Sequence, residues 1–268
     1  MTSITDRVRS KLLTLAWFAA RPELHRELLR RITAFNVRTA RSVAKDRLDK
    51  RSGVAWCRAV VAPVDELVAQ GFVAVDAPTL SANHGTELQE AAVRFAAAGG
   101  TMGGPAHLDV LYRVTRHLNP SVVVETGVAA GWSSLAILLS LAEGDADGRL
   151  WSADMPYPKR DNERFVGCVV PADLQSRWEL VRCADRDALP QILSRCGRVD
   201  FAHYDSDKSI SGRSFGYRTL WAALRDGGVL MSDDIEDNLA FRDFVETVGR
   251  RALVIRKDGD NYAGLIRK

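Results

Sequence analysis

From Pro120 to the end of the chain, short apolar runs alternate with longer amphipathic stretches, and this alternation limits the fold more than any other feature. The runs that predict strands are 122–124, 149–153, 179–182, 199–203, 228–232, 252–256 and 262–267. Helical stretches separate most of them, so we expect repeated βα units and an α/β fold with a doubly wound, mostly parallel seven-stranded sheet. Asp258-Gly259 is a hairpin turn signal, which predicts an antiparallel C-terminal pair.

The first part of the chain lacks this alternation. Its periodicity predicts helices over 4–20, 22–50 and 54–70, with Ser52-Gly53 ending the second of them. We therefore expect a helical N-terminal extension over residues 1–99, used for oligomerisation or as an active-site cover, and an α/β domain over residues 100–268.

Charge is unevenly distributed between these parts. Residues 1–52 carry 13 Lys and Arg against 5 Asp and Glu, whereas the remainder carries 24 against 29. The favoured interpretation is that basic helices dock on the acidic body or on a second subunit, in a homodimer or higher homo-oligomer. Contact of these helices with a membrane is a less favoured alternative. The four cysteines are scattered, which favours reduced thiols and a cytoplasmic location.

The loop from Glu125 to Gly131 is the first candidate site. It follows the apolar run 122–124, turns at Gly127 and Gly131, and leads into a helix that is predicted to begin near Ser133. Glycine lets the backbone turn tightly and lets a ligand approach closely. A dinucleotide site would need G-x-G-x-x-G, and a carboxylate at the strand end does not suit a phosphate. The loop therefore argues against a dinucleotide.

These residues resemble the first motif of class I S-adenosylmethionine (SAM)-dependent methyltransferases, and the resemblance covers roughly residues 100–268. It implies a Rossmann-like fold and a SAM site made by Glu125, Gly127, Gly131, Ser133, Asp154 and Asp185. Asp154 would hold the ribose hydroxyls, and Asp185, displaced by one position from the usual acid, would lie near adenine. Taken singly, Glu125 could cap a helix and Asp154 could lie in a turn; together at strand ends they favour the cofactor.

Three further acids follow neighbouring predicted strands. Asp205 comes after the fourth strand, and Asp233 and Asp234 come after the fifth. Adjacent parallel strands lie about 4.8 Å apart, so these side chains can converge, and converging carboxylates repel unless a cation lies among them. Mg²⁺ takes such oxygen ligands. The alternatives are that Lys208 neutralises an acid in a solvated loop and that Asp233-Asp234 caps a helix.

This segment is similar to the metal-dependent catechol-type O-methyltransferases, whose pattern is D-x-x-K followed by an acid and Asn. Asp205 and Lys208 match D-x-x-K, while Asp234 replaces the Asn. The resemblance implies a Mg²⁺ site at Asp205, Asp233 and Asp234, with Lys208 as the base for the acceptor hydroxyl. A base would need a depressed lysine pKa. His203 is expected to be a satisfied core histidine.

The predicted function is a SAM-dependent, Mg²⁺-assisted O-methyltransferase acting on a hydroxyl of a small molecule. A looser likeness, carried by Gly103-Gly104, His107 and Asn238, resembles bacterial methyltransferases that modify sugars, glycolipids and natural products. It makes a saccharide or glycolipid precursor the candidate acceptor, with the loop 155–171 shaping its pocket. The alternatives are a nicotinamide-dependent oxidoreductase and a non-catalytic, membrane-associated partner protein. No basic, aromatic surface points to nucleic acid.

Overall fold

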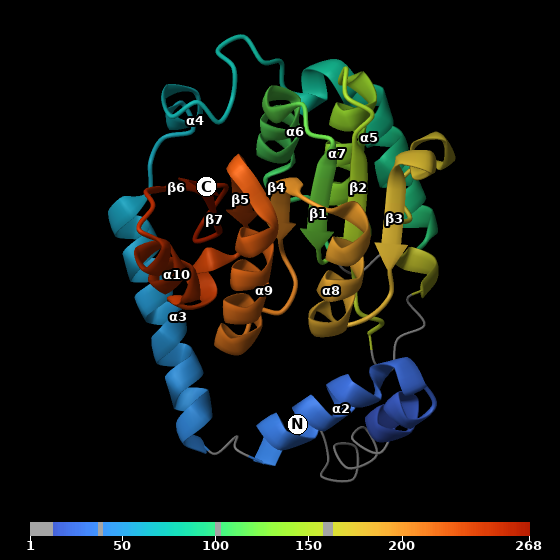
Figure 1. The fold of residues 1–268 in the computed structure, drawn as a ribbon, viewed down its shortest axis with the longest axis vertical. Coiled ribbons are helices and arrows are strands. Elements are labelled where there is room, and N and C mark those ends of the chain that lie inside the picture. The colour runs from blue at the N-terminus through green and yellow to red at the C-terminus, as the bar shows by residue number, and fades with distance from the viewer. Residues whose placement is uncertain (1–12, 37–39, 100–102, 158–162) are drawn as a thin grey trace.

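The computed structural model describes residues 13–36, 40–99, 103–157 and 163–268, and its centre is a seven-stranded sheet (Figure 1). The strand order is β3-β2-β1-β4-β5-β7-β6. The strands are β1 (Val122–Thr126), β2 (Arg149–Ala153), β3 (Trp178–Val181), β4 (Val199–Tyr204), β5 (Leu224–Ser232), β6 (Ala252–Arg256) and β7 (Tyr262–Arg267). The first five run parallel, and β7 pairs antiparallel with both β5 and β6. The predicted fold class is confirmed.

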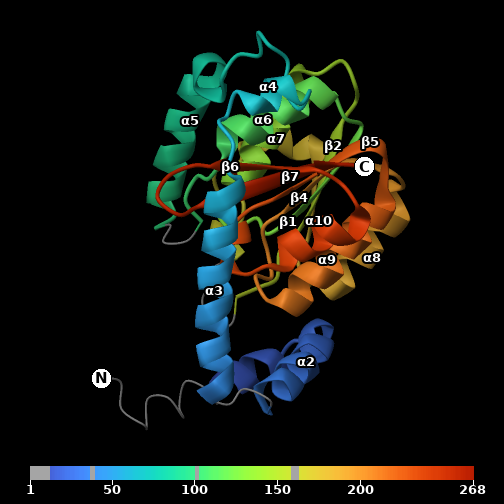
Figure 2. The ribbon, with the colours of Figure 1, turned by 90° about the vertical axis from the view of Figure 1, so that its left-hand side faces the viewer.

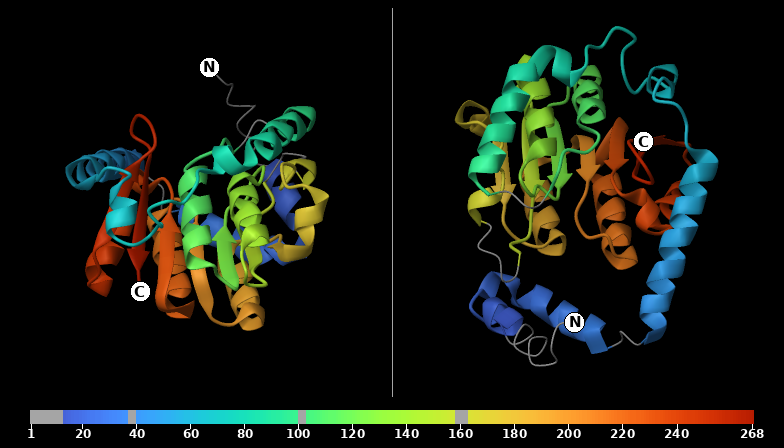
Figure 3. Two further views of the ribbon diagram at one scale, coloured as in Figure 1. Left: turned by 90° about the horizontal axis from the view of Figure 1, so that it is seen from above. Right: turned by 180° about the vertical axis from the view of Figure 1, so that it is seen from behind.

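Helices cover both faces of the sheet (Figures 1 and 3). One face carries α5 (Leu80–Ala97), α6 (Leu108–Leu118) and α7 (Trp132–Glu143), and the other carries α8 (Asp185–Cys196), α9 (Ile210–Ala223) and α10 (Ala240–Val248). Alternate strand residues point to opposite faces, so Phe201 and Met231 enter one apolar core while Ala202 and Leu230 enter the other. The sheet is therefore buried on both sides, as its apolar strands require.

The N-terminal part packs against this domain. It contains η1 (Pro22–Leu24), α2 (His25–Asn36), α3 (Ala40–Val60) and α4 (Glu66–Ala69). α2 lies beyond the carboxyl ends of the parallel strands, and α3 runs along the β6 edge of the sheet (Figures 1 and 2). Phe18 and Leu24 are fully buried in the core under α8, α9 and α10. No helix in the described ranges is both long and apolar enough to cross a membrane.

The predicted end of a helix at Ser52-Gly53 is wrong, because α3 continues through both residues to Val60. Gly53 does not end the helix. It allows α3 to pack closely against a neighbouring segment. A Cβ at this position would overlap the backbone oxygen of Glu236, in the short helix η4 (Ile235–Asp237). The helix predicted over 54–70 is divided: after α3 the backbone N–H of Ala62 bonds to the Val254 carbonyl (2.8 Å) before α4 begins.

The predicted loop over 205–214 is also too long. α9 begins at Ile210, and the hydroxyl of Ser209 accepts a hydrogen bond from the backbone N–H of Gly212 at 3.0 Å. This N-cap satisfies a donor that the first helical turn leaves free. The part of the predicted 4–20 helix before residue 13 lies outside the described residues, while residues 13–19 are helical.

Candidate active site

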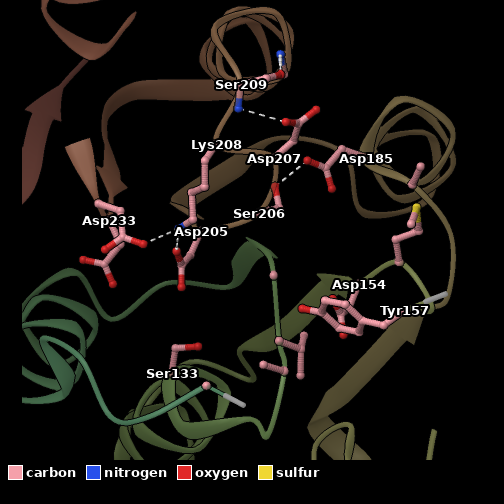
Figure 4. Close-up of a pocket in the computed structure, with 18 of the residues that line it drawn as sticks. Ser133, Asp154, Tyr157, Asp185, Asp205, Ser206, Asp207, Lys208, Ser209 and Asp233 are labelled. Atoms are coloured by element: carbon pink, nitrogen blue, oxygen red, sulfur yellow. Dashed lines mark hydrogen bonds and ion pairs between the residues drawn. The ribbon is translucent and has the colours of Figure 1, made fainter. Parts of the chain in front are cut away.

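A cavity of about 1170 Å³ opens at the carboxyl ends of the parallel strands (Figure 4). Ligands of open α/β sheets bind at this edge, and the volume is sufficient for a cofactor together with a small second molecule. Eight of the ten predicted site residues line it: Gly127, Ser133, Asp154, Asp185, Asp205, Lys208, Asp233 and Asp234. Glu125 and Gly131 are not among its lining residues.

Gly127 allows two loops to cross at the floor of the cavity. Its φ is +84°, a left-handed conformation that favours glycine, and an added Cβ would overlap the backbone oxygen of Asp205. The backbone N–H of Asp205 in turn bonds to the Thr126 carbonyl at 2.8 Å. Gly131, with φ +93°, is the N-cap residue of α7 and lies against Gly167. Gly127 therefore permits the close approach of the loop that follows β4, whereas Gly131 begins α7 in close contact with Gly167.

Glu125 lies beneath the cavity, fully buried. Its carboxylate accepts hydrogen bonds from the hydroxyls of Ser134 (2.6 Å) and Ser152 (2.8 Å), and Nδ1 of His203 is 3.4 Å away. These partners belong to α7, β2 and β4, the elements that surround β1. The sequence predicts a cofactor contact here, but the geometry makes Glu125 an internal link between elements that carry the cavity.

Asp154 follows β2, is only 4% exposed and lines the cavity. Arg182 donates from Nη1 to its Oδ2 (2.9 Å) and to its backbone oxygen (2.6 Å). Burial raises the pKa of Asp154 to about 6, although the charge of Arg182 opposes the rise. Arg182 also pairs with Glu163 (2.8 Å). Arg182 was not predicted as a site residue, because no sequence signal distinguishes it from the many surface arginines.

Asp185 is the first residue of α8 and lines the same cavity. The Ser206 hydroxyl donates a hydrogen bond to its carboxylate. Burial raises its pKa to about 6, a rise that the Ser206 bond opposes. Met155 and Tyr157, which follow β2, also line the cavity, whereas residues 158–162 of the predicted 155–171 pocket loop lie outside the described part of the chain.

Lys208 bridges two of the predicted metal ligands. Its Nζ contacts the carboxylate of Asp205 and lies 2.7 Å from Oδ2 of Asp234. Burial lowers the pKa of Lys208, but the two carboxylates outweigh burial and the net pKa is raised. This differs from the depressed pKa that a lysine base requires. The side chain therefore carries its proton at neutral pH and is a donor in this arrangement.

Asp233, the third predicted ligand, faces two histidines instead of Lys208. It is 3% exposed, and its oxygens lie 3.7 Å from Nε2 of His107 and 3.8 Å from Nε2 of His203. Burial alone would raise the Asp233 pKa, but the two histidines lower it. Burial also opposes the charge on His203, yet Asp233 and Glu125 raise its pKa to about 10. His203 is thus buried in the core, as expected, and its ring lies between two carboxylates.

The three predicted ligands are not arranged as Mg²⁺ requires. Among the described residues, no group of three or more His, Cys, Asp or Glu side chains is arranged to hold a metal ion. An ammonium spans Asp205 and Asp234, while Asp233 faces histidines. Arranged in this way, the carboxylates do not fit a divalent cation, and Mg²⁺ remains a prediction from the resemblance alone.

Arg213 fixes the turn that carries these acids. The side chain is 1% exposed and donates to the backbone oxygens of Asp233 (3.3 Å) and Asp234 (2.7 Å) and to the hydroxyl of Tyr217 (2.8 Å). Asp234 adopts a left-handed φ of 50°, which these contacts hold in place. Arg213 was not predicted as a site residue, because the sequence pattern placed it in the loop over 205–214.

The N-terminal extension reaches the same cavity through α2. Glu27 and Arg30 line it, and Nη2 of Arg30 lies 3.2 Å from Oδ2 of Asp187 in the first turn of α8. A helix that precedes the α/β domain in sequence thus forms part of the cavity wall.

Comparison with known proteins agrees with this architecture. Residues 124–235 match a family model described as a methyltransferase domain. An O-methyltransferase from Bacillus cereus in complex with SAH is 18% identical with a TM-score of 0.54, covering 79% of this chain and 100% of that chain. The O-methyltransferase TomG from Streptomyces achromogenes, involved in tomaymycin synthesis and in complex with SAM, is 18% identical with a TM-score of 0.52, covering 76% of this chain and 96% of that chain. No curated protein sequence matches significantly. The predicted Rossmann-like fold, which these methyltransferases share, is confirmed.

Proposed function

We propose that this chain, which carries a methyltransferase domain over residues 124–235, transfers a methyl group from SAM to a hydroxyl of a small molecule. The observation that carries the proposal is the buried carboxylate of Asp154 at the end of β2, facing a cavity beside the glycine loop that follows β1. A carboxylate can accept hydrogen bonds from two vicinal ribose hydroxyls. The matched domain and the SAM- and SAH-bound structural neighbours support the choice of donor.

In the proposed reaction the bond between sulfur and methyl carbon breaks as the bond from the acceptor oxygen to that carbon forms. The sulfonium becomes a neutral thioether, and the hydroxyl proton leaves the acceptor. Such a displacement depends mainly on holding the two molecules in line. Asp205 can receive the proton because its carboxylate lines the cavity, while the Lys208 ammonium can donate a hydrogen bond to the acceptor oxygen.

The charge of the cavity wall supports a neutral or cationic acceptor. Seven of its lining residues are acidic (Glu27, Asp154, Asp185, Asp205, Asp207, Asp233 and Asp234), against three basic ones (Arg30, Arg186 and Lys208). An acceptor with phosphate or carboxylate groups would meet net repulsion. A hydroxyl-rich, uncharged saccharide or glycolipid precursor fits better. We also propose that α2, whose Glu27 and Arg30 line the cavity, covers it.

The proposal is tested by calorimetry with SAM, followed by transfer of labelled methyl groups from SAM to a panel of neutral sugars and glycolipid precursors. We expect saturable binding of SAM and labelling of at least one hydroxyl compound. A nicotinamide cofactor serves as the comparison ligand, and we expect it not to bind. Absence of SAM binding, or preferential binding of the nicotinamide cofactor, would contradict the proposed function.

The raised pKa of Asp154 predicts a pH dependence of cofactor binding. Above pH about 6 the side chain is ionised and can accept two hydrogen bonds, whereas below it the side chain is protonated and loses this capacity. We expect the association constant for SAM to fall by about tenfold per pH unit below pH 6. Calorimetry at pH 7, 6 and 5 measures the fall. In Asp154→Asn the dependence should become shallower, and equal affinities for wild type at pH 7 and 5 would refute the assignment.

A further inference from the structure

We propose that Lys208 provides, from within the chain, the positive charge at the acceptor oxygen that a divalent metal provides in the catechol-type enzymes, so that this protein binds no catalytic metal. The inference rests on the proposed function for the identity of the reaction. Its evidence is the arrangement of charged side chains at the ends of β4 and β5, and it reverses the expectation drawn from the D-x-x-K resemblance.

The Lys208 ammonium occupies the position between two of the carboxylates that a metal would need. Nζ contacts Asp205, which follows β4 (Figure 4). It also lies 2.7 Å from Oδ2 of Asp234, which follows β5. An ammonium has three N–H donors. Two are directed to these acids, so one remains for an oxygen in the cavity, which Lys208 also lines.

The third carboxylate faces two histidines instead of the other two acids. Asp233 lies between the rings of His107 (3.7 Å) and His203 (3.8 Å), both of which are buried. Mg²⁺ requires oxygen ligands in near-ideal octahedral geometry at about 2.0–2.1 Å. To assemble them, Asp233 would have to leave the histidines and Lys208 would have to leave both of its acids.

The backbone and side chains around Lys208 hold it in this position. Nδ2 of Asn238 donates to the Lys208 carbonyl (2.8 Å), and the next residue, Ser209, caps α9. Nδ2 of Asn261 donates to Oδ1 of Asp234 (2.8 Å), leaving Oδ2 for the ammonium. Lys208 is therefore held both at its backbone carbonyl and at its ammonium group. An incoming cation would have to break the contacts of the ammonium group with Asp205 and Asp234.

The test measures metal binding directly, without SAM or an acceptor, by titrating the full chain with Mn²⁺ and following the free-ion signal in electron paramagnetic resonance. We expect no stoichiometric binding to wild type. Lys208→Met keeps the length of the side chain but removes its charge, and we expect it to bind one Mn²⁺ at least about tenfold more tightly than wild type does. Adding Asp234→Asn to this variant should abolish the gain.

Two control variants distinguish the loss of the Lys208 charge from the loss of a lysine charge elsewhere and from a change of the side chain alone. Lys50→Met removes a lysine that pairs with Asp237 (2.8 Å) and does not line the cavity, so no gain of Mn²⁺ binding is expected. Lys208→Arg keeps the charge and should also bind no metal. If Lys208→Met fails to fold, the melting temperature of wild type with and without saturating Mg²⁺ decides the question, because a ligand that binds only the folded state raises it.

An unchanged melting temperature supports the inference. Tight one-to-one Mn²⁺ binding by wild type, or a rise of its melting temperature with Mg²⁺, would overturn it. Failure of the proposed function appears separately, as absence of SAM binding in calorimetry, and neither metal measurement depends on that result.

Discussion

Asp154→Ala is expected to weaken the binding of SAM by about 100-fold. Hydrogen bonds to a charged group contribute roughly 1.5–3 kcal/mol each, and the loss of two ribose contacts amounts to about 3 kcal/mol, or two orders of magnitude in Kd. The same change leaves Arg182, which donates to the Asp154 carboxylate at 2.9 Å, without that partner. Calorimetry of SAM binding at neutral pH measures the effect.

Two matched variants show whether this loss belongs to the cofactor contact. Asp154→Asn keeps the shape of the side chain and one acceptor oxygen, so we expect an intermediate loss. Asp173→Ala removes an exposed acid on η3 (Ala172–Arg177), away from the cavity lining, and should leave affinity unchanged. If Asp154→Ala bound SAM within about threefold of wild type, the ribose would have to be held elsewhere.

Gly127→Ala is expected to lower the free energy of unfolding by about 3 kcal/mol or more and to abolish SAM binding. Two costs combine: φ is +84°, and the new methyl group would overlap the Asp205 backbone oxygen. A non-glycine residue in the left-handed region alone costs of order 1–3 kcal/mol. The overlap would also push Asp205 away from Lys208. Urea unfolding measures the stability change, and calorimetry measures the loss of binding.

Gly71→Ala is the comparison that isolates the overlap. Gly71 has a similar φ of +69°, but no atom lies within 4 Å of the position that a Cβ would take. We expect this variant to lose only the conformational contribution, about 1 kcal/mol, and to bind SAM normally. Equal losses in the two variants would mean that the contact between the β1 and β4 loops contributes nothing.

The strands were predicted well because their pattern is local. Three strands, β2, β6 and β7, were predicted with the bounds that the structure has, since each is a short apolar run bounded by turn residues. The beginning of α9 was missed because Ser211-Gly212 there has low helix propensity. Tertiary contact decides instead: a Cβ at Gly216 in the same helix would overlap the ring of Tyr204, so glycine permits the helix to pack on β4.

The site could be predicted only to the level of the sheet edge. Asp154, Asp205 and Asp233 all line the cavity, because the carboxyl ends of parallel strands meet at one edge. The sequence could not reveal which way each acid turns. Glu125 points inward because Ser134 and Ser152, on two other elements, offer it hydroxyl donors. Such pairings depend on distances between segments that no sequence spacing specifies.

The packing of α3 has a consequence for how this protein could have evolved. Gly53 lies against Glu236, and Lys50 pairs with Asp237 (2.8 Å), so α3 contacts the short helix that directly follows the acids of the cavity. A shortened gene product beginning near residue 100 would contain all seven strands but lose this support, together with the apolar side chains that residues 67–91 contribute to the core. Residues 50–53 and 236–237 are therefore expected to change together among descendants of this sequence, although the matched domain contains neither segment.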